Sequence, residues 1–210
     1  MKLLVDVDAV AKLANWQVLL ESPSVLGCSV SDCATVTSLR FRAMSSTKKA
    51  DGKLFQNTEA ATLALQAIEK MGALAEIDDS ALVEFENING IDPGEALLFS
   101  EVISHPHVYV LTGDKRALRS LSALPESTRV QLAGRVILIE QVLLRLLDVH
   151  GLAWLRERVC PAKQLDKAVN AIMGSRCDAG EQSVRDGMAS YIREIAVLYD
   201  PSLLAQFSSS

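Results

Sequence analysis

MKLLVDVDAV, at residues 1–10, begins with a short apolar run over residues 2–7 that suits a buried strand. Apolar residues at helical spacing follow at once, over residues 10–20. A buried strand that leads directly into a helix is typical of α/β proteins. Asp6 lies near the end of the apolar run, where a carboxylate is costly to bury unless it has a partner.

The alternation of strands and helices continues through about residue 139, and only helical periodicity follows. It predicts an α/β protein with a three-layer α/β/α fold and a mostly parallel sheet, followed by C-terminal helices. We therefore expect an α/β domain over residues 1–140 and a helical extension over residues 141–210. The further strands are expected at residues 74–77, 108–111 and 135–139, and the further helices at residues 29–44, 58–71, 78–86, 92–103, 114–124, 140–149, 153–159, 162–173 and 181–198.

The composition predicts a folded chain with a sizeable core. Hydrophobic residues make up 49% and charged residues 22% of the 210 residues, which argues against disorder. The net charge of −5 excludes a general nucleic-acid binder. Any contact with a phosphate backbone therefore needs a local basic patch or a metal ion.

The longest apolar segments of the sequence and its cysteines indicate where in the cell the protein is expected. The most apolar window, residues 136–149, contains Glu140, Arg145 and Asp148, so we expect no transmembrane helix and no membrane partner. The N-terminus lacks the uninterrupted apolar core of a signal peptide.

The cysteines have no zinc-knuckle or redox spacing, and a chain of this length does not need disulfides. We predict a cytoplasmic protein with reduced thiols at its cysteines, which are Cys28, Cys33, Cys160 and Cys177.

Acidic residues lie where α/β proteins place their sites, outside the C-terminal ends of the strands. Asp6 ends the first strand, with Asp8 two residues on, and Asp114 follows the strand at residues 108–111. Glu95 begins the helix before that strand. Carboxylates gathered in this way raise one another's pKa unless a cation lies between them. Because their ligand atoms are all oxygen, they suit Mg²⁺ or Mn²⁺.

Each of these acids also has a structural interpretation. Glu95 can complete a capping box with Asp92, and Asp114 can cap the N-terminus of its helix. Asp8 is suited to a solvent-facing helix start, although it could bind a metal through water. The combination of these acids around Asp6, and no single one of them, predicts a site.

Basic residues offer a surface for nucleic acid, although a charge run can also be a plain solvated surface. Lys115 and Arg116 follow Asp114 on the same predicted helix. The polar loop at residues 45–57 contains one aromatic residue, Phe55, so base stacking receives little support. The segment at residues 40–53 contains one acid, Asp51, and five basic residues, which are Arg40, Arg42, Lys48, Lys49 and Lys53.

Three motifs in order resemble those of PIN domains. LLVDVDAV at residues 3–10 resembles the opening strand of that family, which ends in Asp. DPGEA at residues 92–96 resembles its acidic Gly-Glu-Ala helix start. VLTGDKRAL at residues 110–118 is similar to its strand–Thr–x–Asp–x–x–x–Leu signature. The resemblance covers about residues 1–140.

The resemblance implies a Mg²⁺- or Mn²⁺-dependent ribonuclease that hydrolyses single-stranded RNA, often as a toxin. The expected partners are RNA, a protein partner or inhibitor, and a second copy of the chain. The catalytic and metal-binding carboxylates would be Asp6, Glu95 and Asp114, with Asp8 and Asp92 as further ligands. The residues expected to contact the substrate are Thr112, Lys115, Arg116, Arg40 and Arg42.

One position departs from the family pattern. The family usually places a Glu before a Leu in its second helical region, where this chain has Ser38 before Leu39. The missing ligand leaves two interpretations. Either the site is rebuilt around Asp8 or Asp92, or the protein is a PIN-like scaffold that binds RNA or a protein without catalysis.

An enzymatic alternative is a haloacid-dehalogenase-like phosphatase. DVDAV at residues 6–10 fits the nucleophile motif of that family, and Thr112 fits its strand-end Thr. That family also needs a later Lys and a pair of acids at another strand end. Glu140 and Gln141, after the strand at residues 135–139, supply no such pair, and this alternative does not explain Glu95.

Overall fold

A parallel sheet of short, buried strands forms the centre of the fold. The structure, a computed structural model, describes residues 1–74 and 79–207. Within these residues the sheet has the order β2-β1-β3-β4, with every pairing parallel. Its side chains are almost all buried, as in sheets covered on both faces. The strands are β1 (Lys2–Val5), β2 (Cys33–Ala34), β3 (Val108–Thr112) and β4 (Val136–Leu138).

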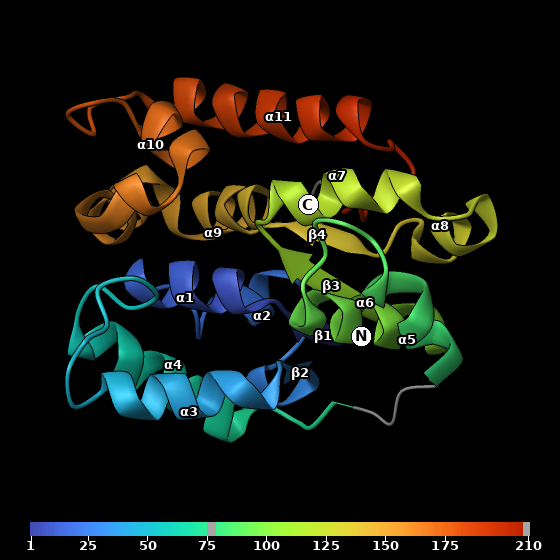
Figure 1. The fold of residues 1–210 in the computed structure, drawn as a ribbon. Coiled ribbons are helices and arrows are strands. Elements are labelled where there is room, and N and C mark those ends of the chain that lie inside the picture. The colour runs from blue at the N-terminus through green and yellow to red at the C-terminus, as the bar shows by residue number, and fades with distance from the viewer. Residues whose placement is uncertain (75–78, 208–210) are drawn as a thin grey trace.

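Helices connect the strands and extend the chain beyond β4. They are α1 (Val7–Asn15), α2 (Ser22–Val25), α3 (Thr37–Ser46), α4 (Thr58–Lys70), α5 (Asp79–Glu86), α6 (Pro93–Ser104), α7 (Lys115–Ser120), α8 (Glu126–Leu132), α9 (Ile139–Val159), α10 (Lys167–Met173) and α11 (Glu181–Leu198), with 3₁₀ turns η1 (Val30–Asp32), η2 (Leu121–Ala123) and η3 (Cys160–Leu165). Figure 1 shows α1 and α9 on one side of the strands and α5, α6 and α8 on the other. The predicted α/β class and parallel sheet are confirmed, and the arrangement is compatible with the predicted three layers.

The strand register brings the C-terminal strand ends to one edge of the sheet. Val5 pairs with Leu111, and Thr112 pairs with Leu138. The backbone N–H of Asp6 donates to the carbonyl oxygen of Leu111 at 3.0 Å. The residues that follow β1, β3 and β4 therefore lie close together, as the prediction of a site at this edge requires.

The helix predicted at residues 29–44 is wrong in its first half. This segment contains η1 and the edge strand β2 before α3 begins. Cys33 and Ala34 are fully buried and pair with β1, but a strand of two residues has no periodicity of its own to detect. The helix α8 was not predicted. The strand predicted at residues 74–77 falls mainly on residues outside the described part of the chain.

The C-terminal segment returns to the sheet. The backbone N–H of Val136 donates to Leu203 at 3.0 Å, and that of Ala205 donates to Val136 at 2.8 Å. Between these bonds Leu204 forms an isolated parallel bridge with Val136. The proposed boundary between residues 140 and 141 lies inside α9, which is interrupted at Gly151 by a positive φ of 79°.

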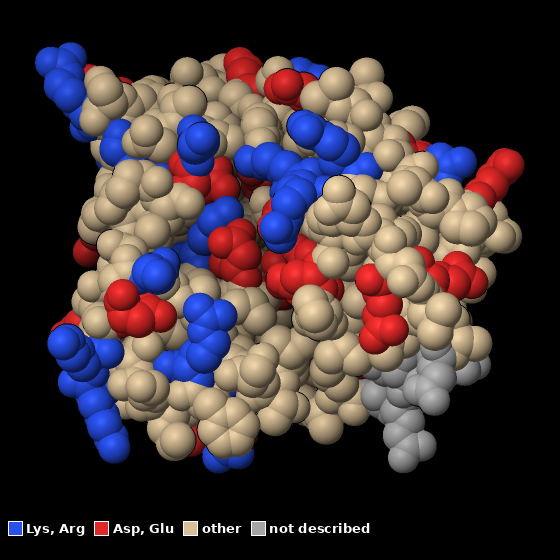
Figure 2. All heavy atoms as spheres, viewed as in Figure 1, with Lys and Arg blue, Asp and Glu red and all other residues tan. Residues whose placement is uncertain are grey.

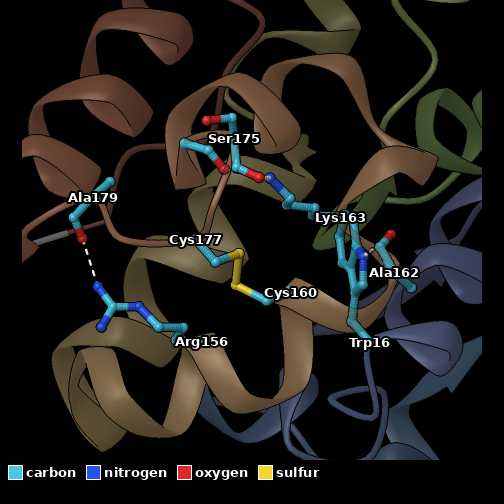
Figure 3. The surroundings of a disulfide bond; sticks show 9 residues. Trp16, Arg156, Cys160, Ala162, Lys163, Ser175, Cys177 and Ala179 are labelled. Carbon is cyan, nitrogen blue, oxygen red and sulfur yellow. Dashed lines mark hydrogen bonds between the residues drawn. A yellow bond between two sulfur atoms is a disulfide. The ribbon is translucent and has the colours of Figure 1, made fainter.

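A disulfide joins Cys160, after α9, to Cys177, after α10 (Figure 3). It contradicts the prediction that every cysteine is a reduced thiol, while Cys28 and Cys33 remain free. The length of the chain indicates only that the fold does not need a disulfide. Which cysteines lie close enough to form one depends on how the chain folds. Beside the disulfide, Nε1 of Trp16 donates a hydrogen bond of 2.9 Å to the carbonyl oxygen of Ala162. Because Trp16 directly follows α1, this hydrogen bond ties the disulfide region to that helix.

Candidate active site

Asp6 is buried at the C-terminal end of β1, with 6% of its surface exposed. Thr112 Oγ1, at the end of the neighbouring strand β3, donates to Asp6 Oδ2 at 3.3 Å. The same Oγ1 accepts the backbone N–H of Asp114 at 3.0 Å. Thr112, predicted to contact substrate, is therefore buried and joins two of the predicted metal ligands.

Glu95 is buried in the first turn of α6, with 4% of its surface exposed. Its Oε2 accepts the backbone N–H of Asp92 at 2.7 Å, and Asp92 Oδ1 accepts the backbone N–H of Glu95 at 2.9 Å. This is the predicted capping box. It fixes the Glu95 carboxyl group at a helix N-terminus, where the peptide dipoles favour negative charge.

Asp114 caps α7 as predicted, since its Oδ1 accepts the backbone N–H groups of Arg116 at 2.7 Å and Ala117 at 3.2 Å. The guanidinium of Arg116 lies 3.2 Å from Asp114 Oδ2 and 4.0 Å from Glu95 Oε2. Arg116, predicted to contact substrate, thus lies between two predicted metal ligands. The glycine before Asp114, Gly113, allows close packing, because an added β-carbon would lie 2.5 Å from Ile139 Cδ1.

The acids act on one another through their charges. Burial raises the pKa of Asp6 to about 6, and the nearby carboxylates of Asp8 and Asp92 raise it as well. Burial likewise raises the pKa of Glu95 to about 7, with contributions from Asp92, Asp114 and Asp6. The structure therefore brings all five predicted acids into one electrostatic cluster at the edge of the sheet.

The cluster fits a hard cation in donor type, because its ligand atoms are all carboxylate oxygens and two of its acids, Asp6 and Glu95, are buried. Within residues 1–74 and 79–207, however, no three His, Cys, Asp or Glu side chains stand close enough to hold a metal ion together. Metal binding would require the carboxylates to approach one another and Arg116 to leave its position between Glu95 and Asp114.

A second charged group lies at the same edge of the sheet and was not predicted. Glu140 is buried two residues after β4, with Lys115 Nζ 3.9 Å from its Oε1. Lys12 Nζ lies 2.7 Å from Asp8 Oδ2 and 2.9 Å from Asp166 Oδ2. The strand-end rule that selects Asp6 also points to Glu140. No local signal marks Asp166, which precedes a helix in the C-terminal extension.

Burial and pairing set the charges in this second group. Burial raises the pKa of Glu140, and the charge of Asp166 raises it further. Burial lowers the pKa of Lys12, but the carboxylates of Asp8 and Asp166 raise it by more. Burial raises the pKa of Asp166, but Lys12, the backbone N–H of Val169 and the charge of Lys115 together lower it by more. Lys12 and Asp166 are therefore both charged at neutral pH.

The other residues predicted to contact substrate have different surroundings. Lys115 Nζ lies over the ring of Tyr191, 4.3 Å from its centre, and so faces the C-terminal extension. Arg40 and Arg42 are exposed on α3, as is Ser38 in its first turn. Figure 2 shows basic side chains over α7 and over α3, with acidic side chains between them.

Comparison of this chain with protein-family models, with curated proteins and with solved structures finds no match. The resemblance to PIN domains, the metal cofactor and the RNA partner therefore stay predictions. Among the helices of the described residues, none is both long and apolar enough to cross a membrane. The cytoplasmic location stays a prediction too.

Proposed function

We propose that this protein is a divalent-metal-dependent ribonuclease that hydrolyses phosphodiester bonds in single-stranded RNA. The observation that carries the proposal is the burial of Asp6 and Glu95 in one charge cluster with Asp114. Buried carboxyl groups that repel one another are stabilised in their charged form by a shared cation. A PIN-like order of motifs along the chain supports the same chemistry.

Each residue of the cluster has a role in this proposal. A Mg²⁺ or Mn²⁺ ion held by Asp6, Glu95 and Asp114 would supply activated water and would neutralise charge on the phosphate. Thr112 orients the Asp6 carboxylate by its hydrogen bond, and the capping box orients Glu95. Arg116 is more than half exposed, so it can turn from the carboxylates to pair with a phosphate.

The charge distribution supports a polyanionic substrate. The chain is acidic overall, so attraction of RNA depends on local cations. Basic side chains over α7 and α3 border the acidic cluster (Figure 2). A strand of RNA lying across these acidic side chains would meet the basic side chains over α7 on one side and those over α3 on the other.

The test is cleavage of a labelled single-stranded RNA by the purified protein in Mn²⁺, in Mg²⁺ and in EDTA. We expect cleavage with either metal ion, none in EDTA, and a loss of about 100-fold or more in Asp6→Asn. Glu194→Gln, at an exposed position of α11, is the matched acid-to-amide control and should cleave as the wild type does. Cleavage that persists in EDTA, or that survives in Asp6→Asn, would refute the proposal.

A second candidate is a PIN-like scaffold that binds RNA or a protein without cleaving. Two observations favour it: Arg116 lies between Glu95 and Asp114, and no three described acids converge on one point. Ser38, in place of the expected Glu, agrees with it. Under this candidate the protein binds RNA equally well with and without metal, and Asp6→Asn leaves that binding unchanged.

A further inference from the structure

Helix α3 carries an exposed aromatic ring between two arginines. The buried side of this helix consists of Leu39, Ala43 and Ser46. Successive residues of a helix are turned by about 100°, so Phe41 points away from the buried side and Arg40 and Arg42 lie on either side of it around the helix. The exposed fraction of Phe41 is 63%, and it is the one aromatic residue among the exposed large hydrophobic side chains of the described residues. A ring in this position is available to a partner.

The surroundings of the ring are cationic. Arg40 forms no ion pair or hydrogen bond with the described residues, and the charge of Arg42 helps to lower the pKa of Asp51. Lys48, Lys49 and Lys53 follow in the next loop. Phe55, the one aromatic residue of the loop at residues 45–57, is fully buried and so cannot meet a ligand. The relevant aromatic residue lies on the helix and not in the loop.

The helix begins next to the acidic cluster. A β-carbon added at Gly94, between Asp92 and Glu95, would lie 3.8 Å from Cγ1 of Val36, the N-cap of α3. Phe41 follows Val36 by five positions, which corresponds to about 7.5 Å along a helix. The start of α3 therefore lies beside the Asp92–Glu95 turn, and Phe41 lies further along the same helix.

We propose that Phe41 stacks on a base of single-stranded RNA while Arg40 and Arg42 pair with the adjoining phosphates. This inference rests on the proposed function and adds the means by which single strands are selected. An exposed ring with cations beside it matches both parts of an unpaired nucleotide, the flat base and the anionic phosphate. In a duplex the bases are stacked inside and cannot reach the ring.

A second copy of the chain fits this surface less well. A two-fold contact through Phe41 would bring Arg40 and Arg42 of each copy towards their counterparts, and like charges would repel. Met44, one turn further on, is 50% exposed and adds little apolar area. The charge complementarity on this face favours the polyanion.

The experiment measures binding in EDTA, so that it does not depend on cleavage. The probes are a fluorescein-labelled oligouridylate and an abasic ribose-phosphate strand of the same length and charge, and the readout is fluorescence anisotropy. We expect the wild type to bind oligouridylate more tightly than the abasic strand. Phe41→Ala should weaken oligouridylate binding about 5- to 100-fold and leave abasic binding unchanged.

Further variants separate stacking from general apolar contact. Phe41→Tyr keeps a ring and should bind as the wild type does, whereas Phe41→Leu keeps apolar surface without a ring and should resemble Phe41→Ala. Val130→Ala removes an equally exposed apolar side chain from α8 and should have no effect. In Phe41→Trp, bound oligouridylate should quench emission more than in the wild type, where Trp16 is buried and Trp154 is half-buried on α9.

Several results would overturn the inference. These are equal binding of both probes by the wild type, no binding of either, unchanged binding in Phe41→Ala, or wild-type binding in Phe41→Leu. A dimer in sedimentation equilibrium that Phe41→Ala dissociates would assign the surface to a second copy. Base-dependent binding without metal-dependent cleavage would refute the nuclease and leave this inference intact. Metal-dependent cleavage together with unchanged binding in Phe41→Ala would support the nuclease and refute this inference.

Discussion

Lys12 and Asp166, 154 positions apart in the sequence, are joined by a contact of 2.9 Å between Nζ and Oδ2. Both side chains are largely buried, and Lys12 also contacts Asp8 of the acidic cluster. Asp166 is in turn the N-cap of α10, where it accepts two backbone N–H groups. The C-terminal extension is thus tied by charge to the helix that follows Asp6.

The first prediction concerns this contact. Lys12→Met should lower the free energy of unfolding by about 3–5 kcal/mol, because it leaves the buried carboxylate of Asp166 without its cation. Asp166→Asn removes the negative charge and the oxygen that contacts Lys12, while its remaining oxygen can still accept the two cap N–H groups and Lys12 still contacts Asp8. Chemical denaturation of both single variants and of the double variant gives the coupling, which we expect to be about 1–3 kcal/mol. Additive effects would show that the contact contributes nothing.

The second prediction concerns pH in metal-free protein. Burial raises the pKa of Asp6 to about 6 and that of Glu95 to about 7. A carboxyl group with a raised pKa favours the folded state while it is protonated. Its contribution is complete below about pH 4 and is lost as the pH rises through 6 and 7. In EDTA, the free energy of unfolding should therefore fall between pH 5 and pH 8, by about 3 kcal/mol.

Asp6→Asn isolates the share of one carboxyl group in this fall. The variant should match the wild type below about pH 4 and exceed its free energy of unfolding by about 1–3 kcal/mol at pH 8. The exposed control Glu194→Gln should follow the wild type at both pH values. A wild-type stability that stays constant over this range would contradict the burial of uncompensated carboxyl groups.

The third prediction concerns the disulfide, whose cysteines are 17 positions apart. A cross-link over a loop of this length stabilises a protein by about 3 kcal/mol in the chain-entropy account. Replacing Cys160 and Cys177 by Ser should lower the free energy of unfolding by about that amount, and Cys28→Ser should have a smaller effect. Thiol titration of the unfolded, unreduced protein should detect Cys28 and Cys33 alone. Four reactive thiols would mean that the bond is absent.

The local features of the site follow from the sequence because they involve near neighbours in the chain. The Asp92–Glu95 capping box and the Asp114 cap depend on residues two or three positions apart. The position of Asp6 follows from the apolar run before it. Glu140 obeys the same strand-end rule, but a single acid with no second acid beside it in the sequence does not mark a site.

The sequence by itself determined the α/β class, the parallel sheet and the acids at its edge, because apolar periodicity and helix caps are set by residues within a few positions. Only the tertiary structure decided the Lys12–Asp166 contact, the Cys160–Cys177 bond and the exposure of Phe41. These depend on which distant surfaces pack together. Burial and charge pairing between distant residues leave no periodic pattern in the sequence. A buried ion pair or a disulfide requires its two residues to be close in space, but it sets no spacing between them in the sequence.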